Sequence, residues 1–517
     1  MAEKRSSTPV KRPWLLGVLF GIAAVLVRVP FAFRYDLHFQ SDSAIMYLMA
    51  KRVLKGEFSF YFWNQEYYGT LVQLLTALVL AVFGSSIVIA TLVTAVMYGL
   101  TVAIGTTYVS RYFGKLCGVG AGVVMAIGVP FMHHYTSMPA DSAYTFSIMA
   151  AVILVFWGAG AVSQPVTVRR MGVFGFALGL GWYLDKHVLV AAAAIGLTYL
   201  ITARGRVLLK SLFRSELLAV FGIAFLVGYS PELIYKVTQK VRPPHPLALL
   251  SLASPEQVVQ NTYWAGRGAL AYFDGDPMSR TPEGVHYLQR NENVDSLPVS
   301  VADWLGVLAA AIVWLGALYF GIRAWRAQDH PQLLLAVYPF VNVALVIFAG
   351  VSQAAYYSAR RYLFSASIFL FMWWGICIVR GMKQKRGWAL SAVLSLVLVL
   401  SVVHQVIMLQ LPDELKDYRS VAAELDKLGI HYAISWYSIS HVMTALTNEK
   451  TVFATIDYGG YKVYQDEVLR QDQIGLVYPT RSGVPPEKVS IQQRAFVRTS
   501  PPSVHGELSL VVYQYAP

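Results

Sequence analysis

Asp42 and Glu66 are two of the three carboxylates in a stretch that is too polar to cross a bilayer and too apolar for an ordinary soluble loop, FQSDSAIMYLMAKRVLKGEFSFYFWNQEYYGTL. A carboxylate at a membrane surface can accept the proton that a hydroxyl nucleophile loses as it reacts, and such general-base help contributes about 10²- to 10⁴-fold in rate. Glu66, followed by Tyr67 and Tyr68, could orient substrate hydroxyl groups. The structural alternatives are a helix cap for Asp42 and a solvated loop acid for Glu66.

A pair of arginines forms the second candidate group. Arg360 and Arg361 precede Tyr362 just outside a predicted span, where guanidinium groups suit the phosphate of a lipid. The alternative is that they extend to membrane headgroups as many arginines do. We expect at least one of them to bind phosphate.

Lys186 and His187 lie between two predicted spans and could also face a phosphate group, although Asp185 can simply neutralise the lysine. Asp141, with His133 and His134 upstream, has a side-chain type that binds divalent metals, but the spacing matches no specific ligand pattern. We therefore predict no metal site and no required cofactor, and keep Asp141 as a candidate for substrate binding.

Membrane helices must position these residues. The 517-residue chain is 56% hydrophobic and only 14% charged, and its mean hydropathy is +0.50. The hydrophobic fraction exceeds that of ordinary soluble domains. A spanning helix needs about 20 apolar residues, and we predict about eleven spans, from Trp14–Phe33 to Trp388–Leu409. The protein is thus predicted to be a polytopic α-helical membrane protein.

The net charge of +13 comes mainly from short loops between spans, a pattern typical of cytoplasmic loops rather than of a nucleic-acid-binding face. This predicts a cytoplasmic N-terminus. No small-residue cleavage site follows the first apolar run, so the first span is predicted to be retained rather than cleaved as a signal peptide. Residues 1–410 then form the membrane domain, with outer loops at 34–85 and 236–300, and residues 411–517 form an extracytoplasmic domain.

The first outer loop is predicted to contain a helix capped by Ser41 or Asp42 and ended by Gly56, lying along the membrane surface. A second short apolar helix is expected over residues 70–83, followed by a break at Gly84 and a span from Ile87. The C-terminal segment alternates helical and extended patterns, which predicts a small α/β domain. Its helix is expected in LPDELKDYRSVAAELDKLG and its strands in HYAISWY, TVFATID and GELSLVVYQY.

Four stretches resemble the GT-C glycosyltransferases, including protein O-mannosyltransferases and the bacterial aminoarabinose transferase. They are the first outer loop, GLGWYLDKHVLV, ARRYLFSASIF, and the outer tail from ELKDYRSVAAELDKLG onward. One departure is that Asn64-Gln65-Glu66 replaces the Gly-Gln pair of the bacterial relatives. The resemblance implies a GT-C-like fold of about eleven spans with interfacial helices in the first outer loop.

The same resemblance implies an inverting enzyme that transfers a hexosyl or pentosyl group from a polyprenyl-phosphate sugar to an extracytoplasmic glycolipid, polysaccharide or protein. Asp42 would be the base, and the other candidates named above would bind substrate. The implied location is the bacterial inner membrane, with membrane lipids as partners and no nucleic acid. The alternatives are a lipid-diphosphate-dependent oligosaccharyltransferase or polysaccharide ligase, and a lipid or solute transporter, although no internal repeat is visible.

Overall fold

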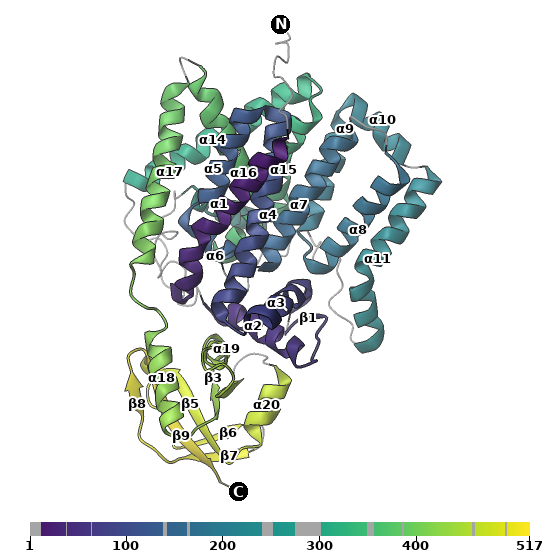
Figure 1. Cartoon of the computed structure of the whole chain (residues 1–517). Coiled ribbons are helices and arrows are strands. Elements are labelled where there is room, and N and C mark those ends of the chain that lie inside the picture. Colours follow the sequence, from purple (N-terminus) through teal and green to yellow (C-terminus); the bar gives the residue numbers. More distant parts are fainter. Residues whose placement is uncertain are drawn as a thin grey trace. The chain divides into compact units, whose positions relative to one another are not determined.

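The computed structural model describes residues 12–37, 39–63, 65–137, 142–162, 166–212, 214–239, 252–273, 301–348, 356–384, 387–456, 461–491 and 494–516 (Figure 1). The polypeptide forms two units. The first contains most of the membrane helices, and the second contains Phe31–Val93 together with Gln410–Pro517. A sequence segment from near the start of the chain therefore folds with the C-terminal segment.

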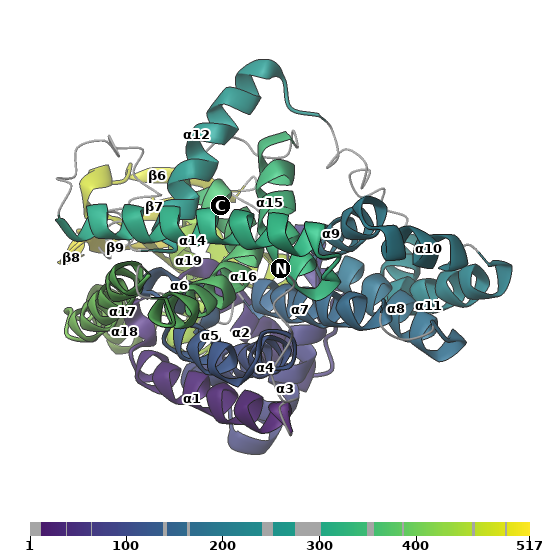
Figure 2. The same cartoon turned by 90° about the horizontal axis from the view of Figure 1, so that it is seen from above.

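The first unit is a bundle of helices, which Figure 2 shows from above. Its helices, two of which extend into the second unit, are α1 (Pro13–Phe33), α4 (Ile87–Phe113), α5 (Lys115–Ile127), α6 (Pro130–Thr136), α7 (Ser142–Ala161), α8 (Val168–Leu184), α9 (Val188–Ile201), α10 (Ala203–Leu212), α11 (Ser215–Gln239), α12 (Pro255–Ala271), α14 (Val301–Arg326), α15 (His330–Phe348), α16 (Tyr356–Met382) and α17 (Trp388–Leu409).

Within the described ranges, eight helices are long and apolar enough to cross a membrane, and the bent pair α9 and α10 gives a ninth if it counts as one span. Large apolar side chains on these helices are exposed, as at Leu26, Ile223 and Val399, because lipid rather than water surrounds a spanning helix. The multi-pass prediction is confirmed, and its first and last spans match α1 and α17. The total of about eleven spans is not confirmed.

Helices α8 and α11 run parallel and very close together (Figures 1 and 2). Gly175 faces the backbone of Phe221 and Gly179 faces that of Phe225, where an added Cβ would lie only 2.5 and 2.1 Å from a carbonyl oxygen. Only glycine permits so close a backbone approach. This contact fixes the end of α8, and with it the Asp185–His187 turn, against the end of α11.

The second unit begins with the short 3₁₀ helix η1 (Tyr35–Leu37), α2 (Ser41–Leu54), the hairpin strands β1 (Tyr61–Phe62) and β2 (Gln65–Gly69), and α3 (Leu71–Phe83). The predicted helices are confirmed, and Gly56 and Gly84 follow them with positive φ. The predicted cap is wrong: Gln40 is the N-cap residue of α2 and makes no side-chain cap hydrogen bond. Ser41 and Asp42 instead bond to a distant part of the chain.

The C-terminal part of this unit is an α/β domain with one mixed sheet. Strand order is β4-β3-β5-β9-β7-β6, with β8 also pairing β9; β3 is parallel to β4 and β5, and the remaining pairs are antiparallel. The elements are α18 (Lys416–Lys427), β3 (Tyr432–Ser435), α19 (Tyr437–Leu446), β4 (Val452–Thr455), α20 (Lys462–Leu469), β5 (Gln473–Pro479), η6 (Thr480–Ser482), β6 (Lys488–Ile491), β7 (Arg494–Arg498), β8 (Ser503–His505) and β9 (Leu508–Tyr515).

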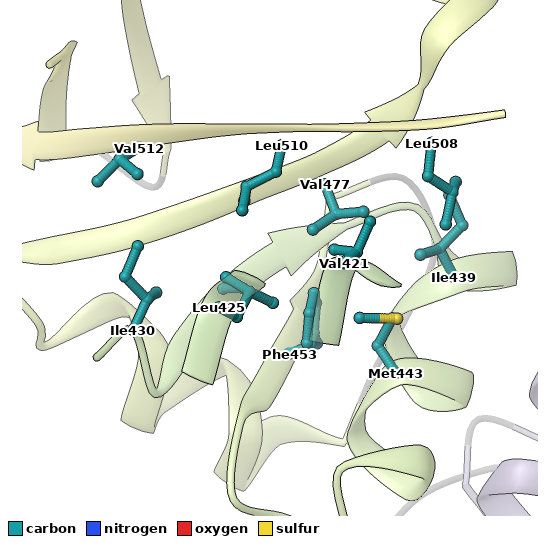
Figure 3. Close-up of a cluster of buried hydrophobic side chains, with 11 residues drawn as sticks. Val421, Leu425, Ile430, Ile439, Met443, Phe453, Val477, Leu508, Leu510 and Val512 are labelled. Atoms are coloured by element: carbon teal, nitrogen blue, oxygen red, sulfur yellow. The ribbon is translucent and has the colours of Figure 1, made fainter. Parts of the chain in front are cut away.

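A buried apolar core joins this sheet to α18 and α19 (Figure 3). Alternate residues of β9, Leu508, Leu510 and Val512, face the same side, as the two-residue period of a strand requires. Val421 of α18 and Met443 of α19 pack against them, and burying each such side chain contributes about 1.5–3 kcal/mol. The predicted helix and three strands are confirmed, and this core fixes the position of α19.

Candidate active site

Asp42 lies in the first turn of α2 and is half-buried. Its Oδ1 accepts a hydrogen bond of 2.7 Å from the hydroxyl of Tyr437, the first residue of α19. The Ser41 hydroxyl donates to the main-chain carbonyl of the same tyrosine. Two hydrogen bonds therefore join the first turns of α2 and α19, and the tyrosine hydroxyl holds one oxygen of the candidate base.

The other ends of the same two helices are joined by ion pairs around Glu449. Its carboxylate lies 2.8 Å from Lys51, 3.0 Å from Arg52 and 3.1 Å from Lys55, and it accepts a 2.8 Å hydrogen bond from the Tyr464 hydroxyl. We call these five residues the Glu449 cluster. Burial opposes ionisation of the carboxyl, but its hydrogen bonds and the cations outweigh burial and lower the pKa of Glu449 to about 2.

Aromatic rings cover the Glu449 cluster on one side. The Arg52 guanidinium lies 4.8 Å from the centre of the Tyr464 ring and 5.6 Å from that of Tyr461, a favourable cation–π arrangement. Trp63, in the turn between β1 and β2, stacks on Tyr461 with 3.9 Å between ring centres. Because α2 is attached at both ends, roughly 20 Å apart at 1.5 Å per residue, α19 cannot slide along it.

A buried polar group in the first unit surrounds the Asp185 carboxylate, at the end of α8. Nδ1 of His187 lies 2.9 and 3.0 Å from its two oxygens, and the Ser147 hydroxyl donates to it over 3.0 Å. Burial opposes ionisation of Asp185, but the histidine outweighs it, so the pKa of Asp185 falls below its ordinary value. Burial lowers and the carboxylate raises the pKa of His187, with a net increase that favours the imidazolium.

Lys186 is paired with an acid that the sequence did not reveal. Its ammonium lies 2.9 Å from Glu232 of α11 and donates to the Trp182 carbonyl. Lys236 binds the other oxygen of Glu232, also at 2.9 Å. Burial lowers the pKa of Lys186, and the facing carboxylate only partly compensates. Two lysines share one carboxylate, which leaves a net positive charge for a further anion. Asp185 pairs directly with His187, and its charge also raises the pKa of Lys186, so the alternative that it helps to neutralise this lysine stays open.

Tyr362 lies in the second turn of α16, and its ring centre is 5.4 Å from that of His187. The Tyr144 ring lies on the same histidine at 6.0 Å. The structure thus brings Tyr362 beside the Lys186–His187 turn, although the two are far apart in sequence. Arg360 and Arg361 belong to the same helix, but their side chains lie outside the described residues.

The remaining candidates are only partly described. Glu66 belongs to β2, but its side chain lies outside the described residues, as does Asp141 entirely. Tyr68, two residues along the strand, is buried. Among the residues that the structure describes, no three His, Cys, Asp or Glu side chains gather as metal ligands. The roles of these three residues and the absence of a metal requirement stay predictions.

Sequence reasoning missed Tyr437 and Glu232, which contact candidate residues, and Glu449, which joins the far end of α2 to α19. Tyr437 and Glu449 flank α19, inside a segment whose family likeness we noted but to which we assigned no chemistry. A signal for Glu232 was present, since an acid near the outer end of a predicted span needs a cationic partner. Nothing in the sequence indicates which cation provides it.

Neither a protein-family model nor a curated protein sequence matches the chain. Solved structures do match along most of its length. ArnT from Cupriavidus metallidurans in the apo state has a TM-score of 0.57 and 12% identity, with 96% of this chain and 97% of that chain covered. The same protein bound to undecaprenyl phosphate has a TM-score of 0.55 and 11% identity over the same shares.

The oligosaccharyltransferase of Archaeoglobus fulgidus also matches, with a TM-score of 0.54 and 12% identity over 90% of this chain and 68% of that chain. All of these proteins are GT-C glycosyltransferases. The chain has the GT-C fold. This confirms the fold class predicted from the sequence, including membrane helices followed by a C-terminal sheet domain. At 11–12% identity the likeness shows the fold and not the activity.

Proposed function

We propose that the protein is a membrane glycosyltransferase that takes a sugar from a polyprenyl monophosphate and transfers it to a hydroxyl group of an extracytoplasmic acceptor. The observation that carries the proposal is the match along 96% of this chain and 97% of ArnT, a protein whose structure contains undecaprenyl phosphate. The half-buried carboxylate of Asp42, at the position where the sequence resemblance implies a base, also supports it.

The proposed reaction is a single displacement. The acceptor oxygen attacks the anomeric carbon, the bond from that carbon to the phosphate oxygen breaks, and the polyprenyl phosphate leaves with the bonding electrons. Asp42 takes the proton from the attacking hydroxyl, which general-base catalysis requires. Attack opposite to the leaving group inverts the anomeric centre. The leaving phosphate carries about two negative charges near neutral pH, so cationic side chains stabilise its departure without a required metal or other cofactor.

Tyr437 positions the base in this proposal. A hydroxyl that donates to Oδ1 of Asp42 at 2.7 Å fixes the carboxylate plane and leaves the second oxygen to receive a proton. Charge-assisted hydrogen bonds of this kind are short and about twice as strong as neutral ones. The C-terminal domain thereby contributes a residue to catalysis, through α19.

Tyr437→Phe is expected to lower kcat about tenfold and to leave the KM for the donor unchanged, because it removes one hydrogen bond to a charged group and no contact with the donor. In an Asp42→Asn background the same change should lower kcat little further, since both substitutions act on the same hydrogen-bonded pair. Steady-state kinetics of the four proteins check this, with Tyr432→Phe on β3 as the matched control. Equal losses in both backgrounds would contradict the positioning role.

Lys186 and at least one of Arg360 and Arg361 bind the donor phosphate in this proposal. The pairing of Lys186 and Lys236 with a single Glu232 supports it, because it leaves a positive charge uncompensated. Glu66, Tyr68, Tyr362, His187 and Asp141 are proposed to orient the sugar or the acceptor. The tail after residue 410 is proposed to shape the acceptor cleft.

Lys186→Gln is expected to raise the Kd for a polyprenyl-phosphate analogue about tenfold, the value of one charge-assisted contact. Folding should survive, because Glu232 keeps Lys236 as a partner. Lys236→Gln is the matched control, since it removes the other half of the same pairing. If both variants lose equal affinity, Lys186 serves only to neutralise Glu232.

The location we propose is the bacterial inner membrane, with the N-terminus in the cytoplasm and the C-terminal domain outside. The basic inner loops support this orientation. A reporter fused after Pro517 is expected to lie outside and one inserted at 384 inside, as measured by alkaline phosphatase and fluorescent-protein fusions. A C-terminal fusion that is active only in the cytoplasm would contradict the orientation.

The donor class tests the proposed function. Purified protein should transfer sugar from a polyprenyl-phosphate sugar to an acceptor mixture in detergent, followed by mass, and should be inactive with nucleotide sugars. Activity with nucleotide sugars alone would contradict the proposal. Flux of substrate across vesicles, without any transfer, would instead favour the transporter.

A further inference from the structure

A cation-lined cavity in the first unit belongs to none of the candidate groups above. Its volume is about 290 Å³, and it lies where α4 ends, α7 ends and α8 begins. Arg111 and Arg170 line it together with Tyr112, Phe156 and Trp157. These residues carry two formal positive charges, and within the described part of the chain no carboxylate lines the cavity. The charge of the lining therefore favours an anion over a cation.

The rings hold one of the two guanidinium groups in place. Arg111 lies over Tyr112 at 5.5 Å and over Phe156 at 5.8 Å from the ring centres. A stacked guanidinium keeps its planar row of N–H donors available and is weakly hydrated, which suits it to the oxygens of a phosphate group. The cavity thus combines a preoriented cation with apolar walls.

Two further donors in the wall lack partners. The hydroxyl of Tyr112 and the indole nitrogen of Trp157 are both buried, and neither has a hydrogen-bond partner among the described residues. Trp157 is held flat against Phe174, with 4.1 Å between ring centres. Buried donors are nearly always paired in folded proteins, so two unpaired donors beside two arginines indicate a ligand rich in oxygen acceptors.

Exposed side chains of α8, the helix that brings Arg170 to the cavity, indicate what carries these oxygens. Val168, Val173 and Phe176 of α8 are 52%, 56% and 43% exposed, and both α4 and α7 are long and apolar enough to span a membrane. A bilayer covers such side chains with acyl chains. Basic pockets between membrane helices on the side with the basic loops bind lipid headgroups. An anion attached to acyl chains can therefore reach this cavity from the bilayer.

We propose that the cavity binds the phosphate of an anionic membrane phospholipid, with Arg111 and Arg170 as its cationic contacts and Tyr112 and Trp157 as additional donors. This site is independent of the proposed sugar transfer. It predicts a bound phospholipid in addition to the lipid-linked donor.

Native mass spectrometry of the full-length protein in neutral detergent tests this directly. The probes are palmitoyl-oleoyl phosphatidylglycerol, phosphatidylcholine with the same chains, and inorganic phosphate. One phosphatidylglycerol should bind at least about tenfold more tightly than phosphatidylcholine. In a separate thermal-unfolding experiment, phosphatidylglycerol should raise Tm and phosphate alone should not, because a ligand that binds the folded state stabilises it.

Three variants locate the binding. Arg111→Gln should weaken phosphatidylglycerol binding about tenfold, whereas Arg206→Gln, an exposed arginine of α10 outside the cavity, should not change it. The double variant Tyr112→Phe, Trp157→Phe keeps the aromatic rings and removes both unpaired donors. Without lipid its Tm should equal or exceed that of the wild type, and with phosphatidylglycerol its gain in Tm should be smaller.

The outcomes separate the possibilities. Equal binding of phosphatidylcholine would overturn the requirement for negative charge. Stabilisation by inorganic phosphate alone would overturn the lipid as its source. Full phosphatidylglycerol binding in both the Arg111→Gln and the double variant would place the lipid elsewhere, and if Arg111→Gln does not fold, the double variant decides alone.

Discussion

Asp42→Asn is expected to reduce turnover by about 10²- to 10⁴-fold, the usual contribution of a general base, while leaving the fold and donor binding intact. The amide keeps an oxygen that can accept from Tyr437, so the hydrogen bond observed at 2.7 Å survives. What it loses is the capacity to take the acceptor's proton. Single-turnover kinetics with a saturating lipid-linked donor measure the chemical step. A binding assay with a polyprenyl-phosphate analogue measures whether donor binding is intact.

The structure makes this substitution more informative than the sequence did. A helix cap was the competing explanation, and Asn caps a helix about as well as Asp, but the N-cap residue of α2 is Gln40, and Asp42 bonds to Tyr437. The matched control is Asp426→Asn, an exposed acid of α18. Near-normal turnover of the Asp42 variant would leave that residue only its structural contact with Tyr437.

Glu449→Gln is expected to destabilise the packing of α2 against α19 by about 3 kcal/mol, because two buried cations lose their shared carboxylate. Lys51 then keeps only the uncharged oxygens of Asn448, and Arg52 keeps only the exposed Glu57 as an acidic partner. The Lys51 and Arg52 side chains are only 9% and 10% exposed, so water cannot replace the carboxylate. Hydrogen–deuterium exchange of peptides from α2 and α19 should accelerate by up to about 100-fold, with Asp426→Asn again as the control. Unchanged protection would show that the Glu449 cluster contributes little.

The same cluster gives a dependence on pH whose sign follows from the carboxyl group. The pKa of Glu449 is lowered from an ordinary 4.5 to about 2, so its stabilisation is fully present above the ordinary value and is lost as the pH falls towards 2. The shift corresponds to roughly 3 kcal/mol at 1.36 kcal/mol per unit. In Glu449→Gln this part of the acid sensitivity of α2 and α19 should disappear.

How much the sequence revealed depended on how local each feature is. Apolar runs and turn residues act within one segment, which is why α1, α17, α18 and the breaks after Gly56 and Gly84 matched their predicted places. Asp42 was selected as the candidate base from its local surroundings together with the family resemblance, and its catalytic role stays a proposal. The error at the start of α2 came from a competing distant contact: Ser41 and Asp42 bond to Tyr437 instead of capping their own helix.

The partners of the candidate residues could not be predicted for the same reason. Tyr437 is 395 positions from Asp42, and Glu232 is 46 positions from Lys186. Which side chains meet depends on how α19 rests on its sheet and on how closely glycines let α8 approach α11. No periodicity within a single segment carries that information.

Identifying the released lipid tests most directly the claim that the donor is a polyprenyl monophosphate sugar. The purified protein is given the same sugar on a polyprenyl monophosphate and on a polyprenyl diphosphate, and the lipid and the glycosylated acceptor are both identified by mass. The account predicts transfer from the monophosphate donor, with one polyprenyl monophosphate released for each sugar transferred and none in Asp42→Asn. Transfer from the diphosphate donor alone, with release of polyprenyl diphosphate, would contradict it and favour an oligosaccharyltransferase or polysaccharide ligase.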